Sequence, residues 1–254
     1  MKPLFTIITV TYNASSTLTP TMESVRNQTF IDFEHLIIDG SSKDNTLQIA
    51  ESLSKANKTK IFSEQDSGLY DAMNKGIDKA CGDYLIFLNS GDAFHSDDTL
   101  EKIADAIKKN DFPGIVYGQT AIVDSNRKII ANRHLIAPEH LEYKSFKDGM
   151  VVCHQAFVVL KRIAPLFDLR YRFSADYDWC IKCLQHSRHN IYINATIIDY
   201  LFEGLTSKNR KKSLIERFKI MTKYYGLATT IIKHLSFIPR FLARRQEENN
   251  ILNN

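Results

Sequence analysis

The chain has 254 residues, of which 44% are hydrophobic and 24% are charged, and its formal net charge at pH 7 is +4. This composition is ordinary for a globular protein, and the length allows one large domain. Four cysteines are too few for a disulfide framework and fit a reducing compartment, and no apolar run reaches the ~18 residues that a membrane span needs.

The two ends of the chain differ in character. The N-terminal apolar run is interrupted by polar residues and is not followed by a small-residue cleavage site, so we expect no signal peptide and a cytoplasmic body. Residues 208–245 contain eleven Lys and Arg and one acid, a net charge of +10, whereas residues 1–207 carry −4. Such a body would bind its ligand through a metal, and such an end would meet an anionic surface.

The first 110 residues predict alternating strands and helices. Short runs rich in apolar and β-branched residues predict strands over residues 4–10, 35–38, 60–63 and 84–88. The segments between them predict helices that run to about residue 27, to about residue 56 and over residues 69–80. This alternation implies right-handed crossovers and an α/β fold with a mostly parallel sheet.

A polar cluster follows each of these strands directly. The clusters are residues 11–13, 39–42, 64–68 and 89–92. The carboxyl ends of parallel strands meet at one edge of a sheet, and nucleotides bind at that edge, so we expect the clusters to line a nucleotide site. Ordinary strand-to-loop turns are the alternative, because Asn, Ser, Gly and Asp all favour turns.

The second half of the chain predicts fewer and shorter elements. A helix runs to about residue 108, and a second helix covers about residues 177–186. Predicted strands cover residues 115–117, 120–123, 151–160 and 190–200, with a hairpin turn at residues 124–126 and polar residues interrupting the third strand.

Asp92, at the end of the fourth cluster, is the best candidate for a metal ligand. Mg²⁺ and Mn²⁺ are held in phosphate-binding sites by one or two carboxylates plus substrate oxygens, so one aspartate suffices. Asp39 follows the second strand and is placed to accept hydrogen bonds from a base or ribose, or else to serve as a turn and helix cap.

Four further polar residues lie on or just before the predicted helix over residues 69–80. Asp66 lies in the loop before the helix, and Asp71, Asn74 and Lys75 share one face at the spacing i, i+3, i+4. The helix begins beside the expected phosphate-binding edge, which favours a binding role. The alternative is a solvated face with an ion pair between Asp71 and Lys75.

Asp176 and Asp178 lie at the start of the helix predicted over about residues 177–186. Carboxylates in a first helical turn stabilise the helix dipole, but one of them could act as a general base that takes a proton from an attacking hydroxyl. Trp179 fits the core better than a sugar-stacking platform. Cys180 and Cys183 have a zinc-like spacing, but their apolar helical surroundings predict buried thiols.

Four of these segments together resemble family 2 glycosyltransferases of the GT-A fold. The likeness is carried by Thr9-Val-Thr-Tyr-Asn13, by Ile38-Asp-Gly-Ser-Ser-Lys-Asp-Asn-Thr46, and by residues 63–77 with residues 82–92, the last ending in Asn-Ser-Gly-Asp. It is strong over about residues 3–110 and continues more weakly through His154-Gln155 and residues 175–178 to 204–207. The branch resembled includes bacterial colanic-acid and other exopolysaccharide transferases.

The resemblance implies transfer of a sugar from a nucleotide-diphosphate sugar to a hydroxyl, with inversion of the anomeric centre and a divalent cation, Mn²⁺ or Mg²⁺, at the leaving diphosphate. It implies that Asp92 binds the metal, that Asp176 is the catalytic base and that Asp39 holds the nucleotide base. The other predicted nucleotide-sugar-binding residues are Thr11, Tyr12, Asn13, Asp66, Asp71, Asn74, Lys75, Asn89 and Ser90.

Three positions depart from the usual pattern of the family. Asn89 and Gly91 stand where the metal motif usually has acids, and Ala175 stands where the later acidic motif usually has glutamate. The branch resembled commonly shows the Asn-Ser-Gly-Asp form, so an active enzyme is still expected.

We therefore predict a GT-A catalytic domain over residues 1–207, with a nucleotide-sugar-binding half over 1–110 and an acceptor-side half over 111–207. A basic amphipathic helical segment follows over residues 208–254. Contact of residues 208–245 with an anionic membrane would suit a lipid-linked acceptor. Packing on the domain and formation of a homo-oligomer are alternatives, and no nucleic-acid-binding module is present.

The predicted function is an inverting glycosyltransferase that uses a nucleotide sugar, with UDP as the expected nucleotide, and a glycan or lipid-linked acceptor. It would work in bacterial polysaccharide biosynthesis at the cytoplasmic face of the inner membrane. A catalytically inactive nucleotide-sugar-binding partner is one alternative, motivated by Asn89 and Gly91. A nucleotidyltransferase is the other, although residues 11–16 lack the Gly and Lys of a phosphate loop.

Overall fold

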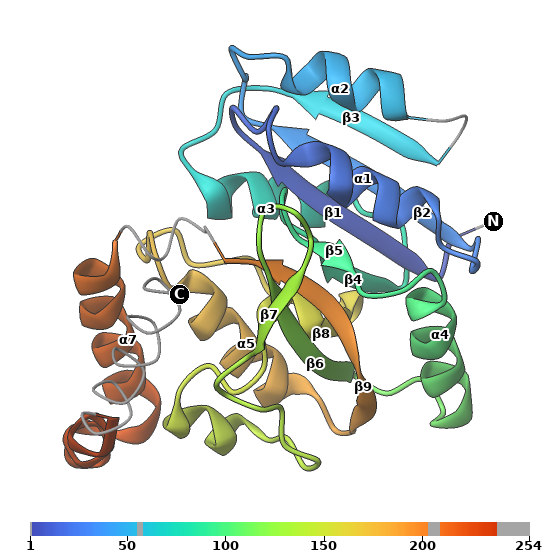
Figure 1. Ribbon diagram of the computed structural model, residues 1–254. Helices are drawn as coiled ribbons and strands as arrows, with labels where there is room; N and C mark the ends of the chain where they lie inside the picture. The colour runs from blue at the N-terminus through green and yellow to red at the C-terminus, as the bar shows by residue number, and fades with distance from the viewer. Residues whose placement is uncertain (1, 55–57, 203–208, 238–254) are drawn as a thin grey trace.

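A computed structural model describes residues 2–54, 58–202 and 209–237. Figure 1 shows helices packed around a curled sheet, which confirms the predicted α/β class. The first half of the chain alternates strands and helices as predicted. Its elements are β1 (Phe5–Thr11), α1 (Leu18–Arg26), β2 (Phe33–Asp39), α2 (Thr46–Leu53), β3 (Thr59–Ser63), α3 (Leu69–Lys79) and β4 (Tyr84–Phe87).

These four strands form the parallel part of the sheet, in the order β3-β2-β1-β4. The register aligns their carboxyl ends, because Thr11 of β1 pairs with Asp39 of β2, and Asp39 pairs with Ser63 of β3. The polar clusters that follow these strands are therefore brought to one edge, as the sequence predicts.

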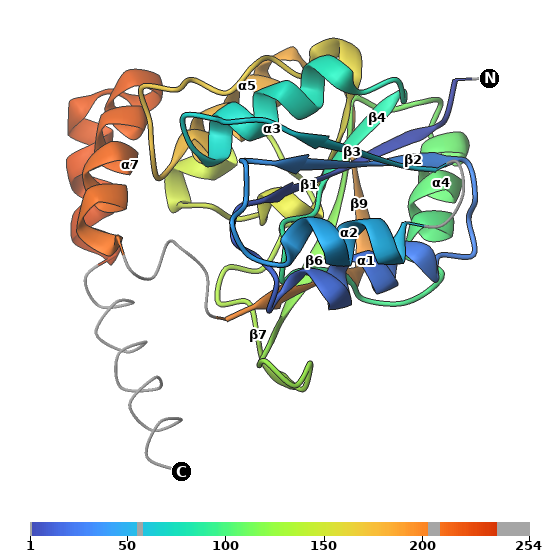
Figure 2. The same cartoon turned by 90° about the horizontal axis from the view of Figure 1, so that it is seen from above.

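Both faces of the parallel strands are covered, which explains why the strands are apolar throughout. In β1, Phe5 and Ile7 face the cluster that contains α4 (Thr99–Lys109), whereas Ile8 and Val10 face the cluster that contains α3 and α5 (Ala175–His186). Figure 2 shows α3 and α5 on one side of the sheet and α1 and α2 on the other.

The second half adds strands of both directions. Its elements are β5 (Ala93–Phe94), α4 (Thr99–Lys109), β6 (Ile115–Val123), β7 (Ile129–Asn132), β8 (Phe157–Leu160), α5 (Ala175–His186), β9 (Asn190–Leu201) and α7 (Arg210–Tyr225). The pairs β4–β8, β6–β8, β6–β7 and β5–β9 are antiparallel, whereas β6–β9 is parallel. The sheet is thus parallel in its first half and mixed in its second.

Two predicted strands differ from those observed. The runs at 115–117 and 120–123 form one strand, β6, because β9 pairs along nearly its whole length, with register shifts near Gln119. The predicted strand over 151–160 is a strand only from Phe157, since residues His154–Ala156 form a 3-10 turn that lifts two polar side chains out of the sheet.

The start of α5 and the α7 helix are joined by buried contacts. Ile220 and Met221 of α7 are buried in the main core. The fully buried Asp178 forms ion pairs with Lys182 of its own helix and with Lys223 of α7, at 2.6 and 3.0 Å. The described part of the basic C-terminal segment therefore packs on the preceding domain, while residues 203–208 and 238–254 of the predictions lie outside the described residues.

Two predictions about core residues are confirmed. Trp179 is fully buried and stacks on Phe167, with ring centroids 4.9 Å apart. Cys180 and Cys183 are buried free thiols, and burial raises the pKa of both. Over the described part of the chain, no helix combines the length and apolar content needed to cross a membrane.

Candidate active site

Asp39 is the centre of the hydrogen bonds that join the ends of β1, β2 and β3. Its carboxylate accepts bonds from the Thr11 hydroxyl at 3.0 Å, the Ser63 hydroxyl at 2.7 Å and the Ser42 backbone N–H at 3.0 Å. Burial would raise the pKa of Asp39, but the bonds from Ser42, Ser63 and Thr11 outweigh it and hold that pKa below its usual value. Asp39 is thus an ionised anchor of this edge, and the Thr11 side chain is buried beneath it.

The exposed surface above this anchor is formed by Tyr12, Gly40 and Asp66. Tyr12 is 66% exposed, so its ring is free to stack on a ligand. A Cβ at Gly40 would lie against the Asp66 carboxylate and 3.4 Å from the Tyr12 ring, so the three residues are close neighbours at this edge. Asn13 has a positive φ of 49° and accepts a bond from the Lys43 N–H at 2.8 Å, which shapes the loop.

The α3 residues that the sequence grouped together have separate roles. Asn74 is buried and bonds to both backbone groups of Phe167, at 3.1 and 2.7 Å, so its amide supports the core. Lys75 pairs with Glu64 at 3.7 Å, and so the ion pair considered between Lys75 and Asp71 is not formed. Asp71 instead accepts a bond from the Ser67 N–H at 2.9 Å.

The Asn-Ser-Gly-Asp cluster after β4 is fixed by neighbouring chain segments. Asp92 is 4% exposed and accepts bonds from the Gln155 side-chain amide at 2.6 Å and the Leu201 N–H at 3.0 Å. Burial raises the pKa of Asp92 to about 6. Ser90 shares a hydroxyl–hydroxyl bond of 2.8 Å with Thr17.

His154 connects this cluster to Asp176. Its Nε2 lies 3.3 Å from the Asn89 amide nitrogen, and its Nδ1 lies 3.4 Å from Oδ2 of Asp176. On the other side, the Tyr70 hydroxyl donates to Oδ1 of Asp176 at 3.1 Å. A continuous polar chain therefore runs from Asn89 through His154 and Asp176 to Tyr70, and brings the predicted base beside the predicted metal motif.

The two carboxylates at the start of α5 have different environments. Burial would raise the pKa of Asp176, but His154, Arg217 and Tyr70 outweigh it and hold that pKa below its usual value. Asp176 is therefore a carboxylate in a polar site. Asp178 is fully buried and forms ion pairs with lysines of α5 and α7, so it stabilises the packing of these two helices.

In the sequence, His154 and Gln155 interrupt a predicted strand and form part of a weaker likeness, and neither is among the predicted site residues. The structure places His154 on Asp176 and Gln155 on Asp92. The signal for them was their position, because they are polar residues that interrupt an otherwise apolar run over residues 151–160.

Asn89 and Asp92 are the residues of this cluster that would hold a divalent cation. Asn89 Oδ1 is buried and has no hydrogen-bond partner in the described structure. With the Asp92 carboxylate it supplies the hard oxygen atoms that Mg²⁺ and Mn²⁺ prefer. No group of three or more His, Cys, Asp and Glu side chains suited to a metal occurs among the described residues, so a cation held by these two would need phosphate and water as its other ligands.

The α/β fold with this polar edge of parallel strands is that of a GT-A-type glycosyltransferase. The model of the glycosyl transferase family 2 matches residues 6–164, and the chain belongs to this family. This membership favours glycosyl transfer over nucleotidyl transfer, the other enzyme class considered from the sequence.

Two curated relatives are similar over most of their length. A "PGL/p-HBAD biosynthesis glycosyltransferase" of Mycobacterium bovis (strain BCG / Pasteur 1173P2) is 31% identical, covering 91% of this chain and 89% of the relative. An uncharacterized glycosyltransferase of Haemophilus influenzae is 27% identical, covering 87% and 88%.

Solved structures share the fold. S. aureus TarS 1-349 aligns with a TM-score of 0.71 at 16% identity, covering 92% of this chain and 72% of that chain. The same protein in complex with UDP-GlcNAc aligns with a TM-score of 0.70 at 18% identity, covering 92% and 73%. The predicted GT-A fold is thereby confirmed.

Proposed function

We propose that this chain is an inverting glycosyltransferase that moves a sugar from a UDP-sugar to a hydroxyl of a glycan or lipid-linked acceptor in bacterial polysaccharide biosynthesis. The observation that carries the proposal is the placement of Asp176 between Tyr70 and His154, one hydrogen-bonded step from the Asn89 cluster. The structural neighbour TarS has been solved in complex with UDP-GlcNAc, and this complex supports the choice of nucleotide.

The proposed reaction is a single displacement. Asp176 accepts the proton of the acceptor hydroxyl as that oxygen forms a bond to the anomeric carbon, and the bond from that carbon to the UDP oxygen breaks. Tyr70 and His154 hold the two carboxylate oxygens of Asp176 in place. Asp92 and Asn89 would hold Mn²⁺ or Mg²⁺, which would neutralise the leaving diphosphate. Tyr12 would stack on the base, and Asp39 and Asp66 would shape its site.

The first prediction concerns donor turnover. Incubation of the full chain with MnCl₂ and a panel of UDP-, GDP-, dTDP- and CMP-sugars should release nucleotide from a UDP-sugar by slow hydrolysis, because water can replace the acceptor. Nucleotide release is measured by chromatography. EDTA should stop the release, since the charge of the leaving diphosphate is then uncompensated.

A different outcome would select the non-enzyme alternative. Binding of a nucleotide sugar with no turnover under any condition would fit an inactive binding partner, the hypothesis motivated by Asn89 and Gly91. Turnover of a GDP-, dTDP- or CMP-sugar in place of a UDP-sugar would correct the choice of nucleotide but leave the proposal of a glycosyltransferase in place.

We also propose that the C-terminal helices hold the protein on the cytoplasmic face of the inner membrane. The helix over residues 227–237 turns its polar side inward, where Lys233 pairs with Asp148 and His234 contacts the Phe218 ring. Its outer side carries Leu227, Ile231, Ile232 and Leu235, which are 44–65% exposed. An apolar outer face on a strongly basic segment is suited to an anionic membrane interface.

The second prediction tests this surface in the full chain. Ile232→Gln with Leu235→Gln should weaken binding to vesicles that contain phosphatidylglycerol by about tenfold or more, because two apolar side chains lose their burial in the interface. Vesicle co-sedimentation measures the effect. Ile31→Gln is the matched control, since Ile31 is 71% exposed on another part of the molecule and should not alter binding. Equal binding of all variants to the vesicles would contradict the membrane proposal. A lower sedimentation coefficient of the double variant than of the wild type, without vesicles, would show instead that this surface joins two copies of the chain.

A further inference from the structure

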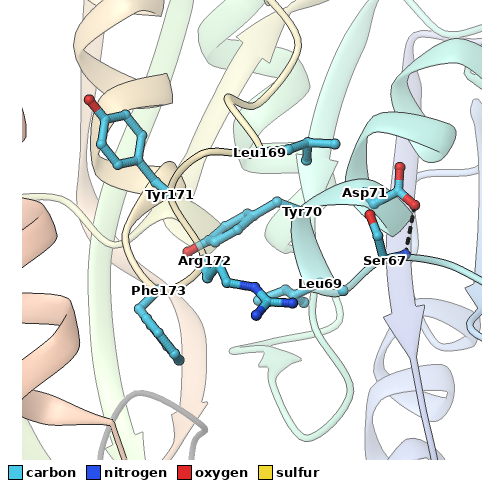
Figure 3. Close-up of a pocket in the computed structure, with 9 residues that line it drawn as sticks. Ser67, Leu69, Tyr70, Asp71, Leu169, Tyr171, Arg172 and Phe173 are labelled. Atoms are coloured by element: carbon cyan, nitrogen blue, oxygen red, sulfur yellow. Dashed lines mark hydrogen bonds between the residues drawn. The ribbon is translucent and has the colours of Figure 1, made fainter.

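An open cavity of about 210 Å³ lies between the start of α3 and the segment that precedes α5. Figure 3 shows Tyr70 in its centre and the Arg172 side chain extending toward Leu69 of α3. Ligand pockets usually hold about 300–1,000 Å³, so this one is too small for a nucleotide sugar and suits a single sugar ring.

The contacts of Asp176 indicate whether the cavity lies on the donor side or the acceptor side of the predicted base. The two oxygens of the Asp176 carboxylate have different partners: Oδ2 faces His154, which leads to the Asn89 cluster, whereas Oδ1 accepts from Tyr70, which lines the cavity. A base in a single displacement stands between the donor and the acceptor. Tyr70 lines the cavity, whereas none of the residues assigned to the diphosphate does.

The lining of the cavity suits a saccharide. Phe173 offers aromatic surface, whereas Arg172 and Asp71 offer polar groups at the rim. The Arg172 side chain forms no hydrogen bond or ion pair with any other residue that the structure describes, so its donors are available to a ligand. Pockets of this kind, mostly apolar with a few placed polar groups, bind small ligands with a defined orientation.

The walls of the cavity are held in place by α7. Glu216 accepts hydrogen bonds from the backbone N–H groups of Arg172 and Phe173, at 2.9 and 2.8 Å. Lys212 of the same helix lies 5.6 Å from the centre of the Phe173 ring. The helix α7, which directly precedes the helix that we place at the membrane, therefore also shapes this cavity.

We propose that this cavity is the subsite for the sugar of the acceptor that bears the attacking hydroxyl, with Arg172 as its principal polar contact. The inference rests on the proposed function. It assigns Asp71, which the sequence grouped with the donor, to the acceptor side.

The third prediction tests the cavity by saturation-transfer NMR. The full chain, loaded with UDP and Mg²⁺, is titrated with methyl glycosides of glucose, galactose, mannose, rhamnose and N-acetylglucosamine, one at a time. At least one glycoside should receive saturation in its ring protons, and Arg172→Ala should weaken its apparent affinity by about tenfold, because a charged hydrogen bond is lost.

Arg170→Ala is the matched control. Arg170 is two residues away, pairs with Asp168 at 2.6 Å and does not line the cavity, so this variant should bind the glycoside as the wild type does. Absence of saturation for every glycoside, or equal weakening by both variants, would overturn the inference. Calorimetric titration of UDP into the same samples separates the two proposals, since a chain that binds glycosides but not UDP contradicts the proposed function alone.

Discussion

Asp176→Asn is expected to lower the rate of sugar transfer by about 10²- to 10⁴-fold, the usual contribution of a positioned general base. Asparagine has nearly the same shape and can still accept the bond from the Tyr70 hydroxyl, so the fold and the site should persist. What it cannot do is take a proton from the acceptor hydroxyl. Steady-state transfer rates measure the loss, and calorimetric titration of UDP checks that donor affinity changes little.

Asp105→Asn is the matched control for this fourth prediction. Asp105 lies on α4 with a side chain that is 57% exposed, and its partner Lys109 is also at the surface. The control should transfer sugar at the wild-type rate. If Asp176→Asn did so as well, another residue would have to be the base, and the chain from Tyr70 to His154 would have only a structural role.

Asp92→Asn is expected to remove the contribution of the divalent cation to donor binding. UDP affinity of the variant should be the same with Mn²⁺ as with EDTA, whereas the wild type should bind UDP at least tenfold more tightly with Mn²⁺, because the ionised carboxylate is the only charged ligand of the motif. Asparagine is preferred to alanine here because it keeps the side-chain volume and one of the two acceptor oxygens. Alanine would leave both the buried Gln155 amide and the Leu201 N–H without their acceptor, at a cost of about 1–3 kcal/mol each.

The pH dependence of metal-free stability gives this fifth prediction an independent measurement. The folded-state pKa of Asp92 is about 6, above its usual value of 3.8, because burial disfavours the charged form. The stability that Asp92 contributes is therefore fully present below its usual pKa and is lost as the pH rises through about 6. Urea titrations between pH 4 and pH 7 should show this loss in the wild type and a smaller loss in Asp92→Asn. Identical pH profiles, together with an unchanged Mn²⁺ effect on UDP binding, would make Asp92 part of an ordinary turn.

The sequence predicted much of the fold because each apolar strand of the first half ends in polar residues. That pattern predicted that the ends of the first three strands, at Thr11, Asp39 and Ser63, lie at one edge of the sheet. The strand register confirms this prediction. The mixed second half could not be predicted in the same way. Short apolar runs such as the one in β8 show that a strand exists, but not which strand it pairs with or in which direction.

Roles that depend on tertiary contacts were also beyond the sequence. Asn74 shared a helical face with Asp71 and Lys75, but the chain brings Phe167 against it, and its amide completes the core. The distinction between Asp176 and Asp178 needed the position of α7, which supplies Lys223 to Asp178 alone. The connection of His154 to Asp176 required residues 22 positions apart to meet.

The bonds from Glu216 to the backbone of Arg172 and Phe173 have a consequence for protein engineering. The matched family region ends at residue 164, so the glutamate and the segment that it fixes both lie beyond it. If the cavity is the acceptor subsite, its shape depends on α7, the helix that carries this glutamate. A chimera that exchanges the C-terminal helix between relatives should therefore also exchange the segment that contains Arg172 and Phe173. If the incoming helix lacks the glutamate, these two backbone N–H groups lose their acceptor.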